Sequence, residues 1–270
     1  MAELSVLMPC YNEDDKIKNN IIETVKTLKN TIDCSFELIV IDDGSTDKTY
    51  KIIENCTKKY NFIKPVQMEQ NSGKGFAIKR GFELATGNYI CFLDGDLDIH
   101  PRIIKNFMDL IKENGFDVII GSKHHPLSNV KFPIHRKILS IGYQYLIKIL
   151  FNIPIKDSQV GLKLFKRDVL TDIFQRILCK KYAFDIELLV NINYRNYKIQ
   201  EAPIDLDLDI NGSNVNIQAF SLMFVDTFAI FYRKNILHYY DDYDKDKEKK
   251  YQRFVSIMKY PYSILNNKNK

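Results

Sequence analysis

The first 122 residues alternate between short apolar runs and segments whose apolar residues recur at helical spacing. The apolar runs predict strands, and the spacing i, i+3, i+4 predicts helices between them. Strands and helices that alternate at this spacing along the sequence predict an α/β fold with a mostly parallel sheet flanked by helices. The predicted strands cover residues 4–9, 36–41, 63–66, 89–93 and 117–120, and the predicted helices cover 15–28, 46–60, 75–84 and 101–112.

The regular alternation of short strands and helices ends after residue 122. Apolar helices are predicted at 138–151 and 217–232, with a further helix at 183–194 and an edge strand within 199–210. We therefore expect one main domain over residues 1–210, with an N-terminal half at 1–122 and a second half at 123–210. An apolar helix within 211–240 and a charged, flexible tail at 241–270 complete the predicted organisation.

Charge and cysteine content narrow the class of protein. The 270 residues include 39 Lys+Arg and 34 Asp+Glu, interleaved along the chain, so nucleic acid is not predicted as a partner. The five cysteines form no CxxC pair and are expected to be reduced, as in a cytoplasmic protein. Polar residues interrupt both apolar helices, so no transmembrane helix is expected, and no signal peptide is predicted at the N-terminus.

Acidic clusters follow the predicted strands. Tyr11-Asn12-Glu13, Asp42-Asp43 and Asp94-Gly95-Asp96 come after the first, second and fourth strands. Because ligands of parallel sheets bind at the carboxyl ends of the strands, these clusters are expected around one crevice. Asp94 and Asp96 fit an Mg²⁺ or Mn²⁺ site completed by substrate phosphates, with Asp98 as a third oxygen ligand. A solvated Asp-Gly turn is the alternative.

A glycine-rich segment, Asn71-Ser72-Gly73-Lys74-Gly75, opens a predicted helix and resembles a phosphate-binding loop. It matches neither GxxxxGK[ST] nor GxGxxG, which disfavours P-loop ATPases and dehydrogenases.

Four strings together resemble the family-2 glycosyltransferases, which have the GT-A fold. They are Pro9-Cys10-Tyr11-Asn12-Glu13, Asp42-Asp43-Gly44-Ser45-Thr46-Asp47, Asn71-Ser72-Gly73-Lys74-Gly75 and Leu93-Asp94-Gly95-Asp96-Leu97-Asp98. Later segments resemble the polyprenyl-phosphate sugar synthases, the dolichyl-phosphate glucosyltransferases foremost and the dolichyl-phosphate mannose synthases next. They are Gly121-Ser122-Lys123, Arg136 with Ser140, 157–165 and 182–189. The resemblance covers roughly residues 3–233.

This resemblance implies a metal-dependent, inverting hexosyltransferase that moves one hexose from UDP-glucose or GDP-mannose to a polyprenyl or dolichyl phosphate. Asp94 and Asp96 match the DxD pair that binds the metal and the diphosphate, and Asp98 stands where a glutamine is frequent. The implied nucleotide-sugar site consists of Pro9, Tyr11, Asn12, Glu13, Asp43, Lys74, Asp94, Gly95 and Asp96.

The resemblance also implies residues around the acceptor. Lys123, Arg136 and Ser140 match positions that meet the acceptor phosphate, and Lys163 would help to neutralise it. Lys123 replaces a frequent arginine, which removes a bidentate contact. Asp185 and Glu187 fall near the acceptor, either as a general base or, alternatively, as a helix cap and a solvent-facing side chain.

A lipid acceptor gives the apolar helices a role at a membrane surface, with basic residues nearby. We therefore expect a peripheral protein on the cytosolic face of a membrane. A core contact or a homo-oligomer interface would explain the same helices. Two other functions stay open: transfer to a saccharide hydroxyl, and nucleotide-sugar binding without catalysis.

Overall fold

The computed structural model describes residues 2–130, 134–179, 183–206 and 217–241. Its centre is a seven-stranded sheet in the order β3-β2-β1-β4-β7-β5-β8, in which only β7 runs antiparallel to its neighbours within the described residues. The strands are β1 (Leu4–Cys10), β2 (Phe36–Asp42), β3 (Ile63–Gln67), β4 (Tyr89–Phe92), β5 (Val118–Ser122), β7 (Lys163–Lys166) and β8 (Ile199–Pro203). The short strands β6 (Asn129–Val130) and β9 (Asp205–Leu206) pair separately.

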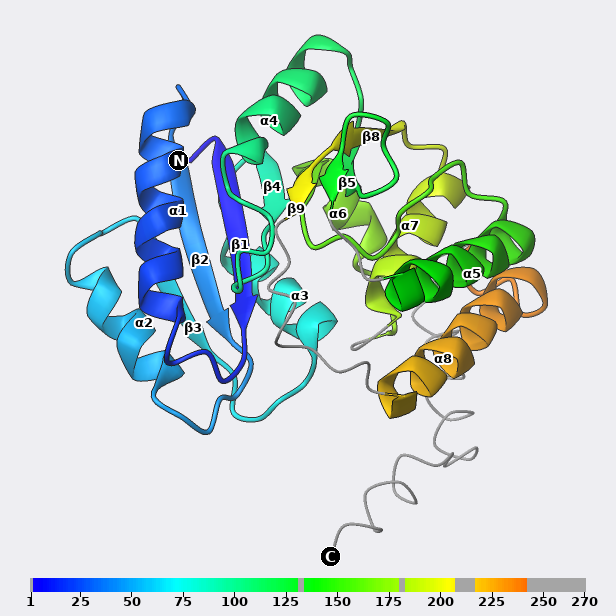
Figure 1. Cartoon of the computed structure of the whole chain (residues 1–270), viewed down its shortest axis with the longest axis horizontal. Helices are drawn as coiled ribbons and strands as arrows, with labels where there is room; N and C mark the ends of the chain where they lie inside the picture. Colours follow the sequence, from blue (N-terminus) through cyan, green and yellow to red (C-terminus); the bar gives the residue numbers. More distant parts are fainter. Residues whose placement is uncertain (1, 131–133, 180–182, 207–216, 242–270) are drawn as a thin grey trace, which may run out of the picture.

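Helices cover both faces of this sheet (Figure 1). Apolar side chains of α1 (Ile17–Thr31), α2 (Thr49–Thr57) and α4 (Ile103–Glu113) pack in one core with Leu4, Val6 and Met8 of β1. Those of α3 (Lys74–Leu84), α6 (Arg167–Ile173) and α7 (Phe184–Tyr194) pack on the opposite face with Leu7. Successive residues of β1 thus point to opposite cores, as the period of a strand requires.

A third apolar cluster lies beyond α7. It joins α7 to α5 (Ile134–Phe151) and α8 (Ile217–Asn235), which lie side by side in Figure 1. Tyr143 and Ile230 are buried in this cluster, whereas Ile149 is 78% and Val225 61% exposed. In the described part of the chain, neither helix is long and apolar enough to cross a membrane.

The register of the parallel strands brings three polar loops to one edge. Cys10 pairs with Asp42, so β1 and β2 end together. β4 ends opposite Leu7, and the chain after it continues beside β1, since Gly95 donates its N–H to the Pro9 carbonyl at 3.2 Å. Tyr11, Asp43 and Asp94, which follow these strands, consequently border the same edge of the sheet.

The predicted α/β class is confirmed, and β8 is an edge strand as expected. The predicted elements up to residue 122 occur with shifts of a few residues at their ends. Three elements were missed: β6, β7 and α6. The sequence of β7, Lys-Leu-Phe-Lys, neither alternates nor forms a continuous apolar run, yet its first three side chains are buried between β4 and β5. The predicted tail, 241–270, lies almost wholly outside the described residues.

Candidate active site

The loops that follow β1 and β2 hold each other. Asn12, with a positive φ of 53°, donates its backbone N–H to Ser45 Oγ at 2.9 Å. Its side-chain oxygen accepts the N–H of Thr46, also at 2.9 Å. Tyr11 is thereby displayed at the rim of a cleft, where its side chain is largely exposed.

Asp43 fixes a third loop, residues 68–73 between β3 (Ile63–Gln67) and α3 (Lys74–Leu84). Its buried carboxylate accepts the backbone N–H groups of Ser72 and Gly73, each at 2.8 Å. Gly73 has a φ of 94°, a conformation that favours glycine, and α3 begins at the next residue, Lys74. Gly73 and Lys74 line the cleft, so the N-terminus of an 11-residue helix opens onto it. A helix N-terminus favours an anion such as a diphosphate.

Three carboxylates follow β4. Lys74 Nζ lies 2.6 Å from Asp94 Oδ1. A Cβ added to Gly161 would come within 2.1 Å of Asp94 Oδ2, so glycine is needed where the two loops meet. Burial, with the charges of Asp94 and Asp98, raises the pKa of Asp96 to about 6. Their mutual repulsion makes this cluster a favourable place for a cation.

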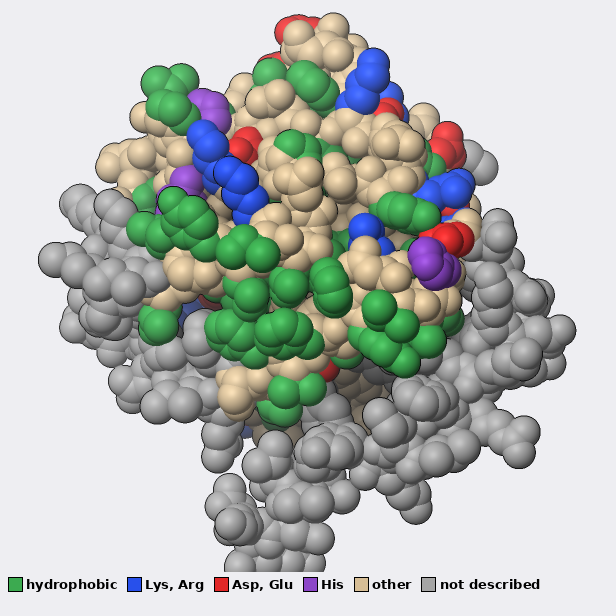
Figure 2. All heavy atoms as spheres, turned by 90° about the vertical axis from the view of Figure 1, so that its right-hand side faces the viewer, with side chains coloured by type: hydrophobic (Ala, Val, Ile, Leu, Met, Phe, Trp, Pro, Cys, Tyr) green, Lys and Arg blue, Asp and Glu red, His purple; other side chains and the backbone are tan. Residues whose placement is uncertain are grey.

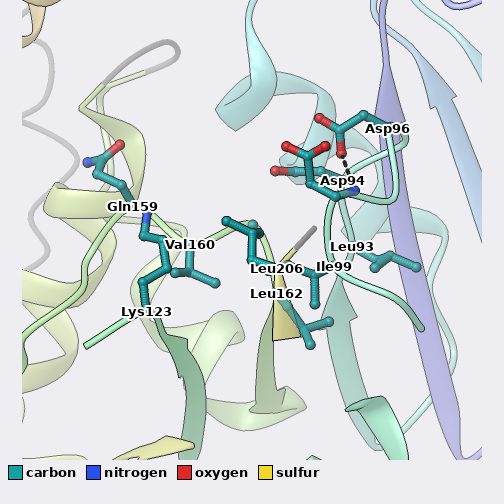
Figure 3. A pocket seen from close by; sticks show the side chains of 11 residues that line it. Leu93, Asp94, Asp96, Ile99, Lys123, Gln159, Val160, Leu162 and Leu206 are labelled. Atoms are coloured by element: carbon teal, nitrogen blue, oxygen red, sulfur yellow. Dashed lines mark hydrogen bonds between the residues drawn. The ribbon is translucent and has the colours of Figure 1, made fainter. Parts of the chain in front are cut away.

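The cleft consists of two adjoining pockets. The larger, of about 460 Å³, is bordered by most of the residues predicted to bind a nucleotide sugar. These are Pro9, Tyr11, Glu13, Asp43, Lys74, Asp94, Gly95 and Asp96. The smaller, of about 190 Å³, is lined by Asp98, Lys123 and several apolar side chains. Asp94, Asp96 and Gln159 border both, and Figure 3 shows Gln159 and Lys123 across from the two aspartates.

The residues predicted to meet an acceptor phosphate do not all line one pocket. Lys123 lines the smaller pocket, and its Nζ lies 3.6 Å from Asp157 Oδ2. Ser140 on α5 accepts a hydrogen bond from Gln144 and is not among the residues lining the two pockets. Arg136 belongs to α5, but its side chain lies outside the described part. Lys163 is fully buried and donates to Asp185 Oδ1 at 2.7 Å.

Asp185 and Glu187 stand in different places. Asp185 borders the larger pocket, and although burial opposes its ionisation, the ammonium groups of Lys163 and Lys74 lower its pKa. Glu187 lies outside that pocket lining and is fully buried. Its carboxylate accepts from Arg233 at 2.8 Å, from the Tyr240 hydroxyl, and from two backbone N–H groups at 178 and 179.

The structural alternatives for these two acids, a helix cap for Asp185 and a solvent-facing side chain for Glu187, are wrong. Glu187 does not face solvent, and the N-terminus of α7 has no side-chain cap from Asp185, which lies within its first turn. Both carboxylates point instead to buried cations on other elements.

The sequence of this chain is similar to those of known proteins. Residues 5–174 match the model of glycosyl transferase family 2. The chain belongs to that family. It is 31% identical to a dolichyl-phosphate beta-glucosyltransferase of Dictyostelium discoideum over 79% of this chain and 68% of the relative. It is 33% identical to ALG5A, a dolichyl-phosphate beta-glucosyltransferase of Trichomonas vaginalis, over 85% and 74% respectively.

Solved structures agree on the fold. Glucosyl-3-phosphoglycerate synthase of Mycobacterium tuberculosis, crystallised with Mn²⁺, UDP and glucosyl-3-phosphoglycerate, aligns with a TM-score of 0.64 at 21% identity. The alignment covers 86% of this chain and 79% of that one. The predicted GT-A fold, family-2 membership, resemblance to dolichyl-phosphate glucosyltransferases and hexosyltransferase class are therefore confirmed.

Gln159 and Gly161 line this glycosyltransferase cleft, although the sequence assigned no role to either. Gln159 borders both pockets, and Gly161 lies against Asp94. Gln159 and Gly161 lie within the segment 157–165, whose resemblance to sugar synthases was the signal that could have identified them. A glycine that permits a close approach has no local pattern, so its role required the structure.

The donor set of the cleft fits a divalent cation. Asp94, Asp96 and Asp98 supply carboxylate oxygens, the ligands that Mg²⁺ and Mn²⁺ prefer. Among the described residues, no three His, Cys, Asp or Glu side chains converge as a complete metal site. One or two carboxylates complemented by phosphates and water are the usual arrangement for Mg²⁺ in nucleotide enzymes, which this cleft can provide.

Proposed function

We propose that this glycosyltransferase transfers glucose from UDP-glucose to a polyprenyl phosphate of the dolichyl type. The observation that carries the proposal is the wall that the two pockets share at Asp94 and Asp96. In a direct displacement, the leaving group and the acceptor stand on opposite sides of one carbon, so donor and acceptor need adjoining pockets. Glucose and the lipid acceptor are favoured because the similar proteins are named dolichyl-phosphate beta-glucosyltransferases.

The nucleotide sugar would occupy the larger pocket. Tyr11 and Asp43, which border this pocket, would contact the base and the ribose, and the N-terminus of α3 would favour the diphosphate. Asp94 and Asp96, with Asp98 beside them, would hold Mg²⁺ or Mn²⁺, which supplies Lewis-acid stabilisation of the departing diphosphate when bound. The Mycobacterium tuberculosis synthase, crystallised with Mn²⁺ and UDP, supports this choice of cation and donor.

A phosphate acceptor agrees with the charges around the smaller pocket. A hydroxyl acceptor would need a general base, but Asp185 is paired with Lys163 and its pKa is lowered. A phosphate monoester carries most of its second negative charge at neutral pH and requires cations that position it. Lys123 lies in the smaller pocket, and we propose that Arg136 and Ser140 of α5 complete the acceptor site.

The same proposal gives a role to the apolar face, by which we mean the exposed apolar side chains of α5 and α8. They are Leu139, Tyr145, Ile149, Val225, Phe228 and Tyr232. Figure 2 views this side of the molecule and shows hydrophobic side chains gathered on it. We propose that this face lies on the cytosolic surface of a membrane, where its polyprenyl acceptor is found.

A donor screen tests the proposed reaction. The protein is incubated with Mg²⁺ or Mn²⁺, each of UDP-glucose and GDP-mannose, and a polyprenyl phosphate, and products are read by mass spectrometry. A polyprenyl-phosphate glucose formed only with UDP-glucose is expected. Transfer from GDP-mannose alone would overturn the choice of donor, and transfer to a saccharide hydroxyl alone would overturn the acceptor.

Flotation with anionic vesicles tests the membrane contact. We expect the parent protein to float at low salt and an Ile149→Lys variant, altered at the most exposed of these positions, to float several-fold less. Leu84→Lys on α3, away from the apolar face, is the matched control. Parent protein that stays at the bottom but forms dimers in solution would indicate an oligomer interface instead.

A further inference from the structure

Asp94 has a close neighbour at each of its two carboxylate oxygens in this structure. Oδ1 accepts a charge-assisted hydrogen bond from Lys74, at 2.6 Å. Oδ2 lies against the backbone of Gly161, where there is no room even for a Cβ. A divalent cation that bonds to Oδ1 therefore competes with the lysine ammonium.

Lys74 is suited to such an exchange. Its side chain and that of Asp94 are both about one-third exposed, so the pair borders the open cleft. The lysine stem is flexible, whereas its backbone is fixed at the start of α3 by the loop that Asp43 holds. The ammonium can consequently move while its point of attachment stays in place.

A second carboxylate keeps the ammonium within the cleft. Asp185 borders the same pocket and acts on Lys74 through its charge. One oxygen of Asp185 accepts from the buried Lys163, which fixes this carboxylate. Lys74 thus interacts with carboxylates from two elements, Asp94 after β4 and Asp185 on α7, and it is the first residue of the helix whose N-terminus favours a diphosphate.

We propose that Lys74 is an exchangeable counter-ion of Asp94. It pairs with Asp94 in the absence of a divalent cation, and it releases Asp94 and contacts the diphosphate of the donor once cation and nucleotide are bound. This inference rests on the proposed function, because it assumes a nucleoside diphosphate and a cation in this cleft.

The exchange gives Lys74 two effects of opposite sign. It opposes binding of the cation alone, because the ion pair with Asp94 must first be broken. It favours binding of the nucleotide, because an ammonium that contacts a diphosphate forms a strong, charge-assisted bond. A lysine that merely supported the fold would weaken both when removed.

The test is a pair of binding measurements on the Lys74→Met variant. Mn²⁺ binding without nucleotide is followed by electron paramagnetic resonance of the free ion, and UDP binding at saturating Mn²⁺ is followed by calorimetry. We expect Mn²⁺ alone to bind up to about fivefold more tightly, the range for a partly exposed ion pair. We expect UDP to bind about tenfold more weakly, or worse, as for a lost bond to a charged group.

Two further variants complete the design. Lys74→Arg keeps the charge and should retain most of the UDP affinity, whereas Lys51→Met, exposed on α2, should change neither constant. Unchanged or weaker Mn²⁺ binding in Lys74→Met would overturn the exchange, as would unchanged UDP affinity. If the parent protein binds neither UDP nor UDP-glucose, the proposed function fails as well; if it binds them and Lys74→Met lacks the opposite shifts, only this inference fails.

Discussion

On the side of the cleft proposed to bind the donor, here called the donor side, the carboxylate of Asp43 is held by two backbone N–H groups, whereas across the cleft the carboxylate of Asp185 is held by the side chain of a buried lysine. Glu187, on the same helix as Asp185, accepts from a buried arginine as well as from a tyrosine hydroxyl and two backbone N–H groups. Backbone donors stay in place when one side chain is changed. A buried ion pair is different, because removing one partner leaves the other charge without compensation. The two sides of the cleft should therefore respond differently to substitution.

The largest expected effect is on stability, through Arg233. Arg233→Met leaves the fully buried Glu187 without its cation, which should reduce the free energy of unfolding by about 3 kcal/mol or more. Chemical denaturation measures this, with Arg80→Met, an exposed arginine of α3, as the control. A loss similar to that of the control would mean that Tyr240 and the backbone N–H groups suffice for Glu187.

Asp96→Asn should act on the reaction rather than on stability. We expect turnover and Mn²⁺-dependent UDP binding to fall about 100-fold, the effect of losing one charge-stabilising group in an active site. Because burial and neighbouring acids raise the pKa of Asp96 to about 6, metal binding by the parent protein should weaken as the pH falls below 6. Asp33→Asn, at an exposed position, is the control. A variant that keeps parental turnover would remove Asp96 from the site.

Gly161→Ala probes the contact between the two sides. Its Cβ would collide with Asp94 Oδ2, so the carboxylate must move. We expect UDP binding with Mn²⁺ to weaken about tenfold, the result of displacing one ligand by roughly an ångström. Gly142→Ala on α5, where an added Cβ meets nothing within 4 Å, is the matched control. Equal affinities in the two variants would show that Asp94 adjusts freely.

The smallest expected effect concerns acid stability at the amino end of β2, away from the cleft. Burial opposes ionisation of Glu37, but hydrogen bonds from Lys64, Ser5 and Thr86 lower its pKa. A carboxyl group with a lowered pKa stabilises the fold above its unfolded pKa of about 4.3 and loses this contribution as the pH falls through the folded pKa.

Glu37→Gln should accordingly cost about 1 kcal/mol at pH 7, and the difference from the parent should vanish in acid. Denaturation curves at pH 7 and at pH 3 check this. A difference that persists unchanged at pH 3 would mean that packing, not charge, accounts for the effect.

Sequence patterns predicted which residues meet on the donor side, but they did not predict the buried ion pairs on the other side. Asp43, Asp94 and Asp96 follow apolar strands, and the register of parallel strands brings such residues together. Lys163 was predicted to meet the acceptor phosphate, but the structure places its ammonium on Asp185, 22 residues further along the chain. Glu187 and Arg233 are 46 residues apart. Ion pairs between distant segments leave no periodic or local signal, so only the folded chain reveals them.

The position of β7 has a consequence for the order in which the chain acquires its structure. The strands β1 to β4 pair with one another and need nothing beyond residue 92 to form their part of the sheet. β5 ends at residue 122, yet its sheet neighbours are β7 and β8, so it has no strand to pair with until residues 163–166 have been synthesised. During synthesis on the ribosome, the part of the sheet made of β1 to β4 can form first, while β5 exposes an unpaired apolar edge for some 40 residues. Chaperone binding or aggregation of nascent chains should therefore be concentrated in that interval.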